Sequence, residues 1–316
     1  MSTSVAREVP THPMGRAVVA VGMFDGVHRG HRALLERTVE LARGTGALSA
    51  VATFDTDPEH VLRPDASVPQ LLDLEDRVRY IASADVEVVL VLPFDRELAD
   101  RTAEEFLDAV LIPAFPPETL VVGSDFRLGR GGACDTRRLT ELSRDRRIEV
   151  ESHELVVVDG APVSATRIRR LISDGRVREA ALLLGRPHAC KGLVVEGRGA
   201  GRRLGAPTAN IDYDRDIAVP ADGVYACVAC IDDSQGRPAA VSVGPAPSYE
   251  DAKAEVEAHI LDFDGELYGR MLRIGFIERL RDQRRFDDEA SLARAIAADV
   301  ERVRTLVPGG DECANL

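Results

Sequence analysis

Apolar runs alternate with amphipathic segments along residues 17–158. Short runs such as AVVAVGMF and VEVVLVLPF are apolar at nearly every position, and segments such as HRALLERTVELAR carry apolar residues at helical spacing. A strand that is apolar on both sides is buried on both faces, and such strands separated by helices form parallel sheets. The pattern predicts an α/β doubly wound domain over residues 17–186, with two short helices, Ala165–Ser173 and Val177–Leu184, at its end.

The pattern changes after residue 186. Short β-like runs, among them GVYACVACIDD and RMLRIGFI, follow one another with Gly, Pro and Asp between them. Strands without intervening helices predict a small antiparallel β-barrel or sandwich over residues 187–307. The segment SLARAIAADVERV predicts a C-terminal helix, with Asp287 or Asp288 as its N-cap. We expect residues 1–16 and 308–316 to be flexible tails.

Composition restricts the class of protein. The chain has 316 residues, of which 45% are hydrophobic and 29% charged, as in soluble globular proteins. It has no apolar run long enough to cross a bilayer and no apolar core of a signal peptide near its start. The net charge of −13 argues against a nucleic-acid-binding surface. We expect a cytoplasmic protein with no membrane or nucleic-acid partner, and the sequence leaves the oligomeric state open.

The five cysteines (Cys134, Cys190, Cys227, Cys230 and Cys313) are scattered and odd in number. This is unlike a disulfide framework, so we expect reduced thiols. Cys227 and Cys230 form a CxxC, but they lie in GVYACVACI, which is typical of a strand. Residues three apart in a strand face opposite sides, which argues against a shared metal ion.

The stretch VGMFDGVHRGH places two histidines, His28 and His31, directly after the first apolar run. Ligands of open α/β sheets bind at the carboxyl ends of strands. Gly22 would let the backbone approach a ligand, and Gly30 lies where free N–H groups at a helix start point toward an anion. Each histidine could donate a hydrogen bond to a phosphate and, when protonated, supply a charge. The alternatives are solvated residues at a helix start and a metal site.

A second candidate site lies in GRGAGRRLGAPTANI. Its glycines allow close approach to phosphate, Pro207 restricts the chain, and Thr208 and Asn210 carry the hard oxygen ligands that Mg²⁺ prefers. A kinase also needs a group that accepts the hydroxyl proton of its substrate. In AEVEAHILDF, alternation places Glu255, Glu257 and His259 on one face of a strand, and the pattern does not choose among them.

Taken in order, these stretches resemble one family. GMFDGVHRGH, VATFDTDPEHVL, LVLPFDRELADRTAEEFL, VVGSDFRLGRGG, VSATRIRRLISDGRVREAALLLGRP and GRRLGAPTANI resemble the prokaryotic bifunctional riboflavin kinase/FMN adenylyltransferase (FAD synthetase) family over roughly residues 17–305. The resemblance implies a nucleotidyltransferase domain followed by a riboflavin kinase domain. It implies that riboflavin and ATP give FMN, and that FMN and ATP give FAD and pyrophosphate. Both steps would require Mg²⁺.

The resemblance also implies roles for individual residues. Glu257 would be the general base of the kinase, and His28 and His31 would contact the ATP phosphates during adenylyl transfer. The implied ATP- and phosphate-binding residues are Gly22, Phe24, Asp25, Gly30, Ser164, Thr166, Arg169, Gly197, Gly201, Gly205 and Pro207. The implied flavin-binding residues are Asp125, Phe126, Arg281 and Phe286. The implied metal ligands are Thr208 and Asn210.

Some positions depart from the family pattern. Thr56 and Asp57 stand where proline and histidine are usual, Ala165 replaces a serine, and residues 132–134 replace a basic loop that ends in glycine. Each change removes a possible contact, and Asp57 could repel an anion. One alternative is therefore a riboflavin kinase with a weak or silent adenylyltransferase domain. Another is a non-catalytic regulator that binds flavin or nucleotide.

Overall fold

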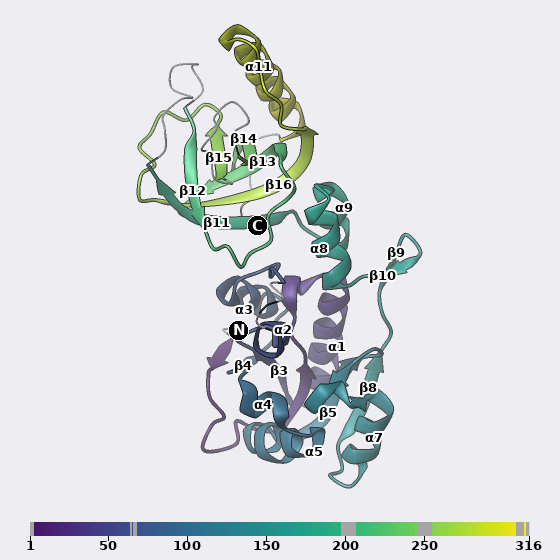
Figure 1. Ribbon diagram of the computed structural model, residues 1–316. Helices are drawn as coiled ribbons and strands as arrows, with labels where there is room; N and C mark the ends of the chain where they lie inside the picture. The colour runs from purple at the N-terminus through teal and green to yellow at the C-terminus, as the bar shows by residue number, and fades with distance from the viewer. Residues whose placement is uncertain are drawn as a thin grey trace. The chain divides into compact units, whose positions relative to one another are not determined.

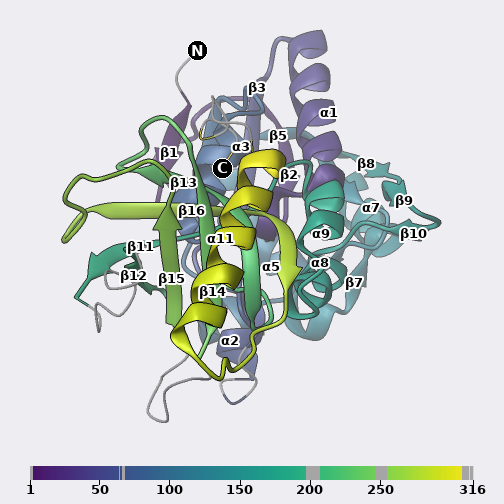
Figure 2. The same cartoon turned by 90° about the horizontal axis from the view of Figure 1, so that it is seen from above.

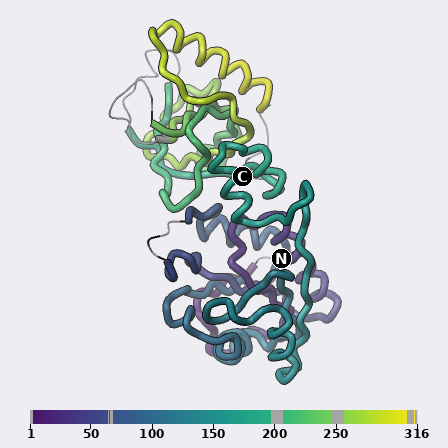
Figure 3. Tube along the Cα trace, turned by 45° about the vertical axis from the view of Figure 1, so that its right-hand side comes forward, coloured from purple at the N-terminus to yellow at the C-terminus, as the bar shows by residue number. Residues whose placement is uncertain are grey.

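The computed structural model describes residues 3–63, 65, 68–196, 207–245, 255–307, 313 and 316. The chain forms two compact units, Met1–Ala165 and Thr166–Leu316, and passes through them one after the other (Figure 3). This division falls before the domain boundary at residue 186 that the sequence predicts. Among the described residues, no helix is long and apolar enough to cross a membrane.

The first unit is built on a six-stranded sheet with the order β1-β4-β3-β2-β5-β8 (Figure 1). Every pair of neighbouring strands is parallel. The strands, in chain order, are β1 (Ser4–Ala6), β2 (Ala17–Val21), β3 (Leu48–Phe54), β4 (Val88–Leu92), β5 (Pro117–Gly123) and β8 (Glu149–His153). Every residue of β2 and β4 is buried, which confirms the predicted parallel sheet with covered faces.

Helices cover both faces of this sheet. One apolar cluster joins the sheet to α1 (Arg29–Thr45) and α3 (Leu74–Ala82). The other joins it to α7 (Thr136–Arg144) and to a helical run over residues 103–114. The shorter elements are η1 (Asp25–Val27), α2 (Pro58–Leu62), α4 (Arg96–Asp100), β6 (Arg127–Leu128), η3 (Arg130–Gly132), β7 (Cys134–Asp135), β9 (Val157–Val158) and β10 (Ala161–Pro162).

The helical run over residues 103–114 changes its hydrogen-bonding pattern twice. It consists of α5 (Ala103–Phe106), the π-helical η2 (Leu107–Leu111) and α6 (Ile112–Ala114). Thr102 and Glu105 form a capping box at its start. Phe106, Leu111 and Ala114 all point into the same core cluster. The sequence predicts a helix here but not its π-helical segment.

The prediction of a flexible tail over residues 1–16 is wrong for the first strand. β1 pairs with β4 through Ser4 and Val88 and through Ala6 and Leu90, and it forms an edge of the sheet. The Thr3 hydroxyl also donates a hydrogen bond to the Val86 carbonyl at 2.7 Å. A strand of three residues is too short to show a pattern in the sequence. It nevertheless forms hydrogen bonds with backbone groups of β4.

The second unit contains a closed antiparallel barrel with the order β11-β12-β15-β14-β13-β16. The strands are β11 (His188–Val195), β12 (Ala209–Tyr213), β13 (Gly223–Ile231), β14 (Arg237–Gly244), β15 (Glu255–Ile260) and β16 (Met271–Arg281). Alternate side chains fill the barrel interior, where Tyr225, Phe276 and Ile274 are completely buried. The structure thus selects a barrel over the sandwich that the sequence left open.

Among its described residues, this unit holds α9 (Val177–Leu184), α11 (Glu289–Leu306) and all of α8 (Ala165–Ser173) except its first residue. α8 and α9 have the predicted bounds, and Gly175 between them adopts a left-handed conformation with φ +73°. α9 packs against β16 and β11 through its apolar face. α11 packs on the outside of β13 and β14 (Figure 2), and Asp288 caps it by accepting a hydrogen bond from the Ser291 N–H at 2.6 Å.

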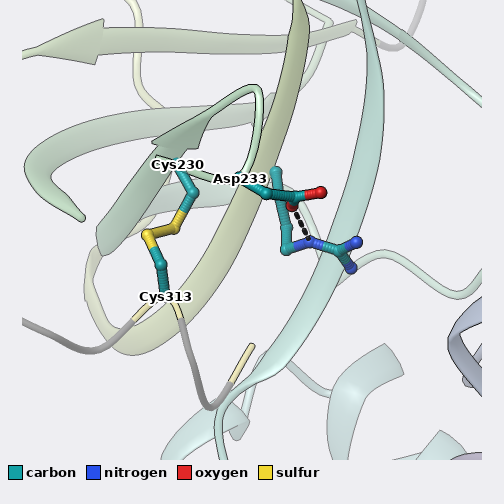
Figure 4. The surroundings of a disulfide bond; sticks show 4 residues. Cys230, Asp233 and Cys313 are labelled. Atoms are coloured by element: carbon teal, nitrogen blue, oxygen red, sulfur yellow. Dashed lines mark hydrogen bonds and ion pairs between the residues drawn. A yellow bond between two sulfur atoms is a disulfide. The ribbon is translucent and has the colours of Figure 1, made fainter. Parts of the chain in front are cut away.

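The expectation of reduced thiols throughout is wrong for one pair. Cys230 on β13 forms a disulfide with Cys313 (Figure 4). Cys227 points into the barrel interior and Cys230 into the cluster outside the barrel, which confirms that the two face opposite sides. Burial raises the pKa of Cys190 to about 12 and that of Cys227 well above its ordinary value. These two thiols are therefore unreactive side chains of the core.

Candidate active sites

The first candidate site is the loop of residues 22–28 that joins β2 to α1. It leaves the sheet between β3 and β5, where the strand order reverses, and ligands of doubly wound sheets bind at such points. Phe24, Gly26 and Val27 have φ angles of 54°, 76° and 35°. Left-handed backbone at a residue other than glycine costs about 1–3 kcal/mol and persists only where surrounding contacts impose it. The rest of the domain therefore holds this loop in one shape.

His28 and His31 stack on each other at the start of α1. Their ring centroids are 3.6 Å apart and the ring planes differ by 13°. His28 is the N-cap of α1, and its Nδ1 accepts a hydrogen bond from the His31 N–H at 3.2 Å. A nitrogen that accepts this bond carries no proton. The neutral His28 ring therefore has its hydrogen on Nε2, where a ligand could accept it.

The His31 ring is uncharged at neutral pH. Burial, followed by the proximity of His28, lowers the pKa of His31 well below its ordinary value. Its Nδ1 is buried and has no hydrogen-bond partner within the part of the chain that is described. The contribution of His31 to phosphate binding would thus be a hydrogen bond rather than the charge that the sequence analysis allowed.

Gly22 in this loop and Gly30 in the first turn of α1 make room for aromatic rings. A Cβ on Gly30 would lie 3.2 Å from Cε1 of His28, and a Cβ on Gly22 would lie 3.3 Å from the Phe24 ring. Both distances are shorter than ordinary contacts between carbon atoms. The glycine between the histidines therefore lets the His28 imidazole lie over the first turn of α1.

Phe24 and Asp25 turn away from solvent. Phe24 is part of the core, and its ring packs edge-on against His31 with centroids 5.2 Å apart. The Asp25 carboxylate accepts hydrogen bonds from the backbone N–H groups of Leu71 at 3.0 Å and Leu72 at 3.3 Å. Any phosphate contact at these two positions would be made by the backbone, and the side chains support the shape of the loop.

An apolar cavity of about 350 Å³ opens beside the same loop. Gly22 and Met23 line one side, and the rings of Phe54, Phe94, Phe106 and Phe126 line much of the rest. The Phe54 and Phe94 rings meet edge to face, with centroids 5.4 Å apart. Of the two predicted flavin-binding residues in this unit, Phe126 lines the cavity, whereas Asp125 is exposed and does not.

The predicted residues Ser164, Thr166 and Arg169 fall on both sides of the division between the units. Ser164 belongs to the first unit and follows Val163, whose carbonyl lies 3.9 Å from where a Cβ on Gly30 would be. This places residue 164 beside the start of α1. Thr166 and Arg169 lie on α8 in the second unit, and their phosphate contacts remain predictions.

The second candidate site is a polar row on the outside of the barrel. Asn210 on β12 lies directly opposite Glu257 on β15, and Glu257 lies opposite Ser242 on β14. Directly opposed side chains on one face are neighbours, with Cβ atoms about 5 Å apart. Their sequence neighbours Ala209, Val241 and Ala258 point into the barrel instead. The geometry thus selects Glu257 as the acidic residue that faces Asn210.

The environment of His259 differs from that of Glu257. Its Nδ1 lies 2.9 Å from the carbonyl oxygen of Pro207, at the entry to β12. Thr208 follows directly and is half-buried. The predicted residues Gly197, Gly201 and Gly205 lie outside the described residues, as does the side chain of Glu255.

The segment after β16 lies next to this row. Gln283 donates hydrogen bonds through Nε2 to the Ser242 hydroxyl at 3.1 Å and to the Val243 carbonyl at 2.6 Å. Arg281 instead pairs with the buried Asp299 of α11, from Nη2 at 2.8 Å and Nε at 3.0 Å. Its guanidinium carbon lies 5.6 Å from the Phe286 ring centroid. The structure brings Arg281 and Phe286 together, and their flavin contacts remain predictions.

Comparison with known proteins decides the family. Residues 11–167 match the FAD synthetase family, and residues 184–307 match the riboflavin kinase family. The bifunctional riboflavin kinase/FMN adenylyltransferase of Pseudomonas fluorescens is 37% identical over 290 residues, which is 92% of each chain. The chain belongs to the bifunctional riboflavin kinase/FMN adenylyltransferase family.

Two further relatives support this family assignment over the whole chain. The bifunctional riboflavin kinase/FMN adenylyltransferase of Escherichia coli strain K12 is 33% identical over 91% of each chain. A crystal structure titled macrolide-efflux protein, from Streptococcus pneumoniae, is 32% identical with a TM-score of 0.86 and covers 96% of this chain and 99% of its own. The efflux activity named in that title is ascribed to that protein and not to this chain.

The departures from the family pattern have specific places in the first unit. Asp57 is buried, and its carboxylate caps α2 by accepting a hydrogen bond from the Glu59 N–H at 2.9 Å. Gly132 lines the apolar cavity through the η3 turn, while Cys134 is buried in the core. Ala165 begins α8. The Asp57 carboxylate thus has a structural role as a helix cap, and this role requires no bound ligand.

Sequence reasoning missed several residues that shape the two sites. In the kinase unit these are Ser242 and Gln283, which carry no recognisable motif. In the adenylyltransferase unit they are Thr53 and Arg77, which both donate hydrogen bonds to the Met23 carbonyl at 3.1 Å. One signal was present, because Arg77 occupies a position at apolar spacing between Leu74 and Ile81. A charge at such a position indicates a buried partner.

Proposed function

We propose that this chain catalyses both reactions of its family through two separate sites. The kinase reaction transfers a phosphoryl group from ATP to riboflavin and gives FMN and ADP. The adenylyltransferase reaction transfers AMP from ATP to FMN and gives FAD and pyrophosphate. The proposal is carried by the presence of a structured site in each unit: stacked His28 and His31 in the first, and Glu257 opposite Asn210 in the second.

In the adenylyltransferase site, the isoalloxazine ring of FMN would occupy the apolar cavity among Phe54, Phe94 and Phe126. A phosphate oxygen of FMN attacks the α-phosphorus of ATP, and the bond from that phosphorus to the pyrophosphate oxygen breaks. Positioning and charge stabilisation carry most of such a reaction. His28 would donate through Nε2 to the leaving pyrophosphate, and the neutral His31 would add a second hydrogen bond.

In the kinase site, Glu257 would accept the proton of the terminal riboflavin hydroxyl as the oxygen attacks the γ-phosphorus of ATP. Thr208 and Asn210 would supply neutral oxygen donors, of which Asn210 lies directly opposite Glu257, and such a set fits Mg²⁺. When bound, Mg²⁺ would neutralise the charge on the nucleotide phosphates. Pro207, held by its carbonyl contact with His259, would set the approach of the chain to these donors.

The partners proposed for this chain are its small-molecule substrates, and its proposed location is the cytoplasm. A net charge of −13 supports neither nucleic acid nor an anionic membrane as a partner. Fractionation of cells that produce the chain at native level tests the location, and recovery in the membrane or secreted fraction contradicts it.

One assay separates this proposal from its alternatives. The purified chain is incubated with riboflavin, ATP and Mg²⁺, and the flavins are resolved by chromatography. Both FMN and FAD should form, and omission of Mg²⁺ should stop both steps. Formation of FMN alone would indicate a silent adenylyltransferase unit, and formation of neither product would indicate a regulator. The placement of Asp57 in a helix cap favours an active first unit.

Site variants test the residue assignments. Glu257→Gln should suppress FMN formation while FMN-to-FAD conversion continues, and the matched control is Asp212→Asn, an exposed residue on the same strand face as Asn210. The double substitution His28→Ala and His31→Ala should do the reverse, with exposed His12→Ala as control. Equal loss of both activities in either variant would count against separate sites.

A further inference from the structure

The side chain of Arg77 is the largest that is completely buried in the described structure. Its Nη1 donates a hydrogen bond to the Met23 carbonyl at 3.1 Å, and its Nη2 donates one to the Asp55 carbonyl at 3.1 Å. Its Nε finds no hydrogen-bond partner among the described residues. Burial lowers the pKa of Arg77, and Asp25 is the largest of the opposing influences. An apolar residue here would avoid the cost of burying a charge.

The two carbonyls that Arg77 binds lie just beyond the carboxyl ends of two neighbouring strands, where the first site also lies. Met23 lies in the loop after β2, and Asp55 follows the last residue of β3. Strands β2 and β3 are neighbours in the sheet, and Met23 also lines the apolar cavity. One planar guanidinium thus joins two adjacent loops, which a single-point cation such as lysine could not do with the same geometry.

Met23 immediately precedes the left-handed residue Phe24, so the orientation of its peptide group determines how the loop turns. The hydroxyl of the buried Thr53 also donates to the Met23 carbonyl at 3.1 Å. Within the turn, the Asp25 carboxylate is held by the backbone N–H groups of Leu71 and Leu72, just before α3. Segment 71–77 therefore holds the loop both directly before its strained turn and within it.

We propose that Arg77 is a positioning residue for adenylyl transfer, which fixes the loop that presents His28 and His31 to the ATP phosphates. The inference rests on the proposed adenylyltransferase function. Arg77 does not touch the reacting atoms. It acts by holding the Met23 carbonyl, and Thr53 acts on the same carbonyl from the neighbouring strand.

The test compares Arg77→Met, which removes the donors, with Arg77→Lys, which keeps a charge. For Arg77→Met we expect kcat of FMN-to-FAD conversion to fall about 10- to 100-fold, the range for a catalytic group displaced by a fraction of an ångström to 1 Å. The KM for ATP should change much less. Arg77→Lys should recover part of the loss, and FMN formation in the second unit should stay at the wild-type rate in both variants.

A matched control and a coupling measurement complete the test. Arg79→Met, two residues along the same helix at an exposed position, should leave both activities unchanged. Thr53→Val should lower kcat, and its effect should be smaller in the Arg77→Met background, because both donors act on one carbonyl. NMR titration of the His31 ring gives a readout without turnover: its pKa should move toward the ordinary value as the loop loosens.

The outcomes separate the inference from the function on which it rests. Absence of FAD formation by the wild-type chain would overturn both. FAD formation by the wild-type chain together with an unchanged kcat in Arg77→Met would overturn the inference alone. A third outcome would also overturn the inference. In it, the loss of FAD formation matches the fraction of protein whose first unit is unfolded, the His31 titration of the folded fraction is unchanged, and Arg77→Lys recovers no activity.

Discussion

The Cys230–Cys313 disulfide should stabilise the barrel unit measurably, and Cys313→Ser removes it. The bridge joins residues 83 positions apart in the sequence. The loop-closure relation for a crosslinked unfolded chain, evaluated at this separation, gives about 15 cal/mol/K, or about 4.5 kcal/mol at 25 °C. Measured values for native disulfides are about 2–5 kcal/mol. We therefore expect oxidised wild type to exceed Cys313→Ser by about 2–4.5 kcal/mol in the free energy of unfolding.

Denaturant unfolding followed by circular dichroism measures this difference, since the chain contains no tryptophan for fluorescence. Peptide mapping without reductant first establishes that the bridge is formed. With reductant, wild type and Cys313→Ser should unfold at the same midpoint, which controls for the serine itself. Equal midpoints without reductant, in protein whose bridge has been mapped, would refute the reasoning. Alkylation of thiols directly on cell lysis shows how much of the chain carries the bridge in the cell.

Three further predictions concern single residues. Asp299→Ala should lower the unfolding free energy of the barrel unit by about 3 kcal/mol in urea, because Arg281 would lose a buried partner. A change below about 1 kcal/mol would show that water replaces the carboxylate. Gly30→Ala should slow FAD formation with FMN formation unaffected, because its Cβ would displace the His28 ring; an equal rate in a coupled assay would remove the proposed role of this glycine. Burial lowers the pKa of His188 to about 4, whereas the pKa of histidine in the unfolded chain is about 6.5. The folded state therefore favours the neutral ring, and its stability falls as the pH drops from about 6.5 toward 4. The second unit should lose roughly 3 kcal/mol of unfolding free energy over this range. His188→Gln should remove most of this pH dependence, and an unchanged pH profile would contradict it.

Periodic patterns in the sequence predicted the regular elements well. α8 and α9 have the predicted bounds, β2 and β4 are apolar and buried throughout as expected, and Asp288 proved to be the cap of α11. Hydrophobic periodicity reports burial, and these elements are defined by the faces they bury. The family assignment is confirmed as well, because the motifs that carry it lie in both units.

Features that depend on long-range pairing could not be read from the sequence. β1 is too short to show a pattern, and the Cys230–Cys313 pairing depends on where the chain after α11 returns. Asp25 shows how a motif residue can be recognised while its contacts stay hidden: its carboxylate binds two backbone amides 46 and 47 residues away. Only coordinates reveal that kind of partner, because the amides of Leu71 and Leu72 leave no mark in the side-chain pattern.

The π-helical segment Leu107–Leu111 has a consequence for how this family tolerates insertions and deletions. A π-helix holds more residues per turn than the α-helices on either side, so removing one residue from it would restore a continuous α-helix. Each residue of an α-helix advances the chain by about 100°. The same deletion from a continuous α-helix would rotate one flank relative to the other by this angle. Because an i→i+5 turn holds one residue more than an i→i+4 turn, deletion from the π-helical segment would leave Phe106, which lines the cavity, close to its present orientation relative to Ala114, which fills the core. The π-helical segment thus accommodates a change of one residue in chain length without a change in the shape of the apolar cavity, and homologues one residue shorter here should keep an aromatic residue at the position of Phe106.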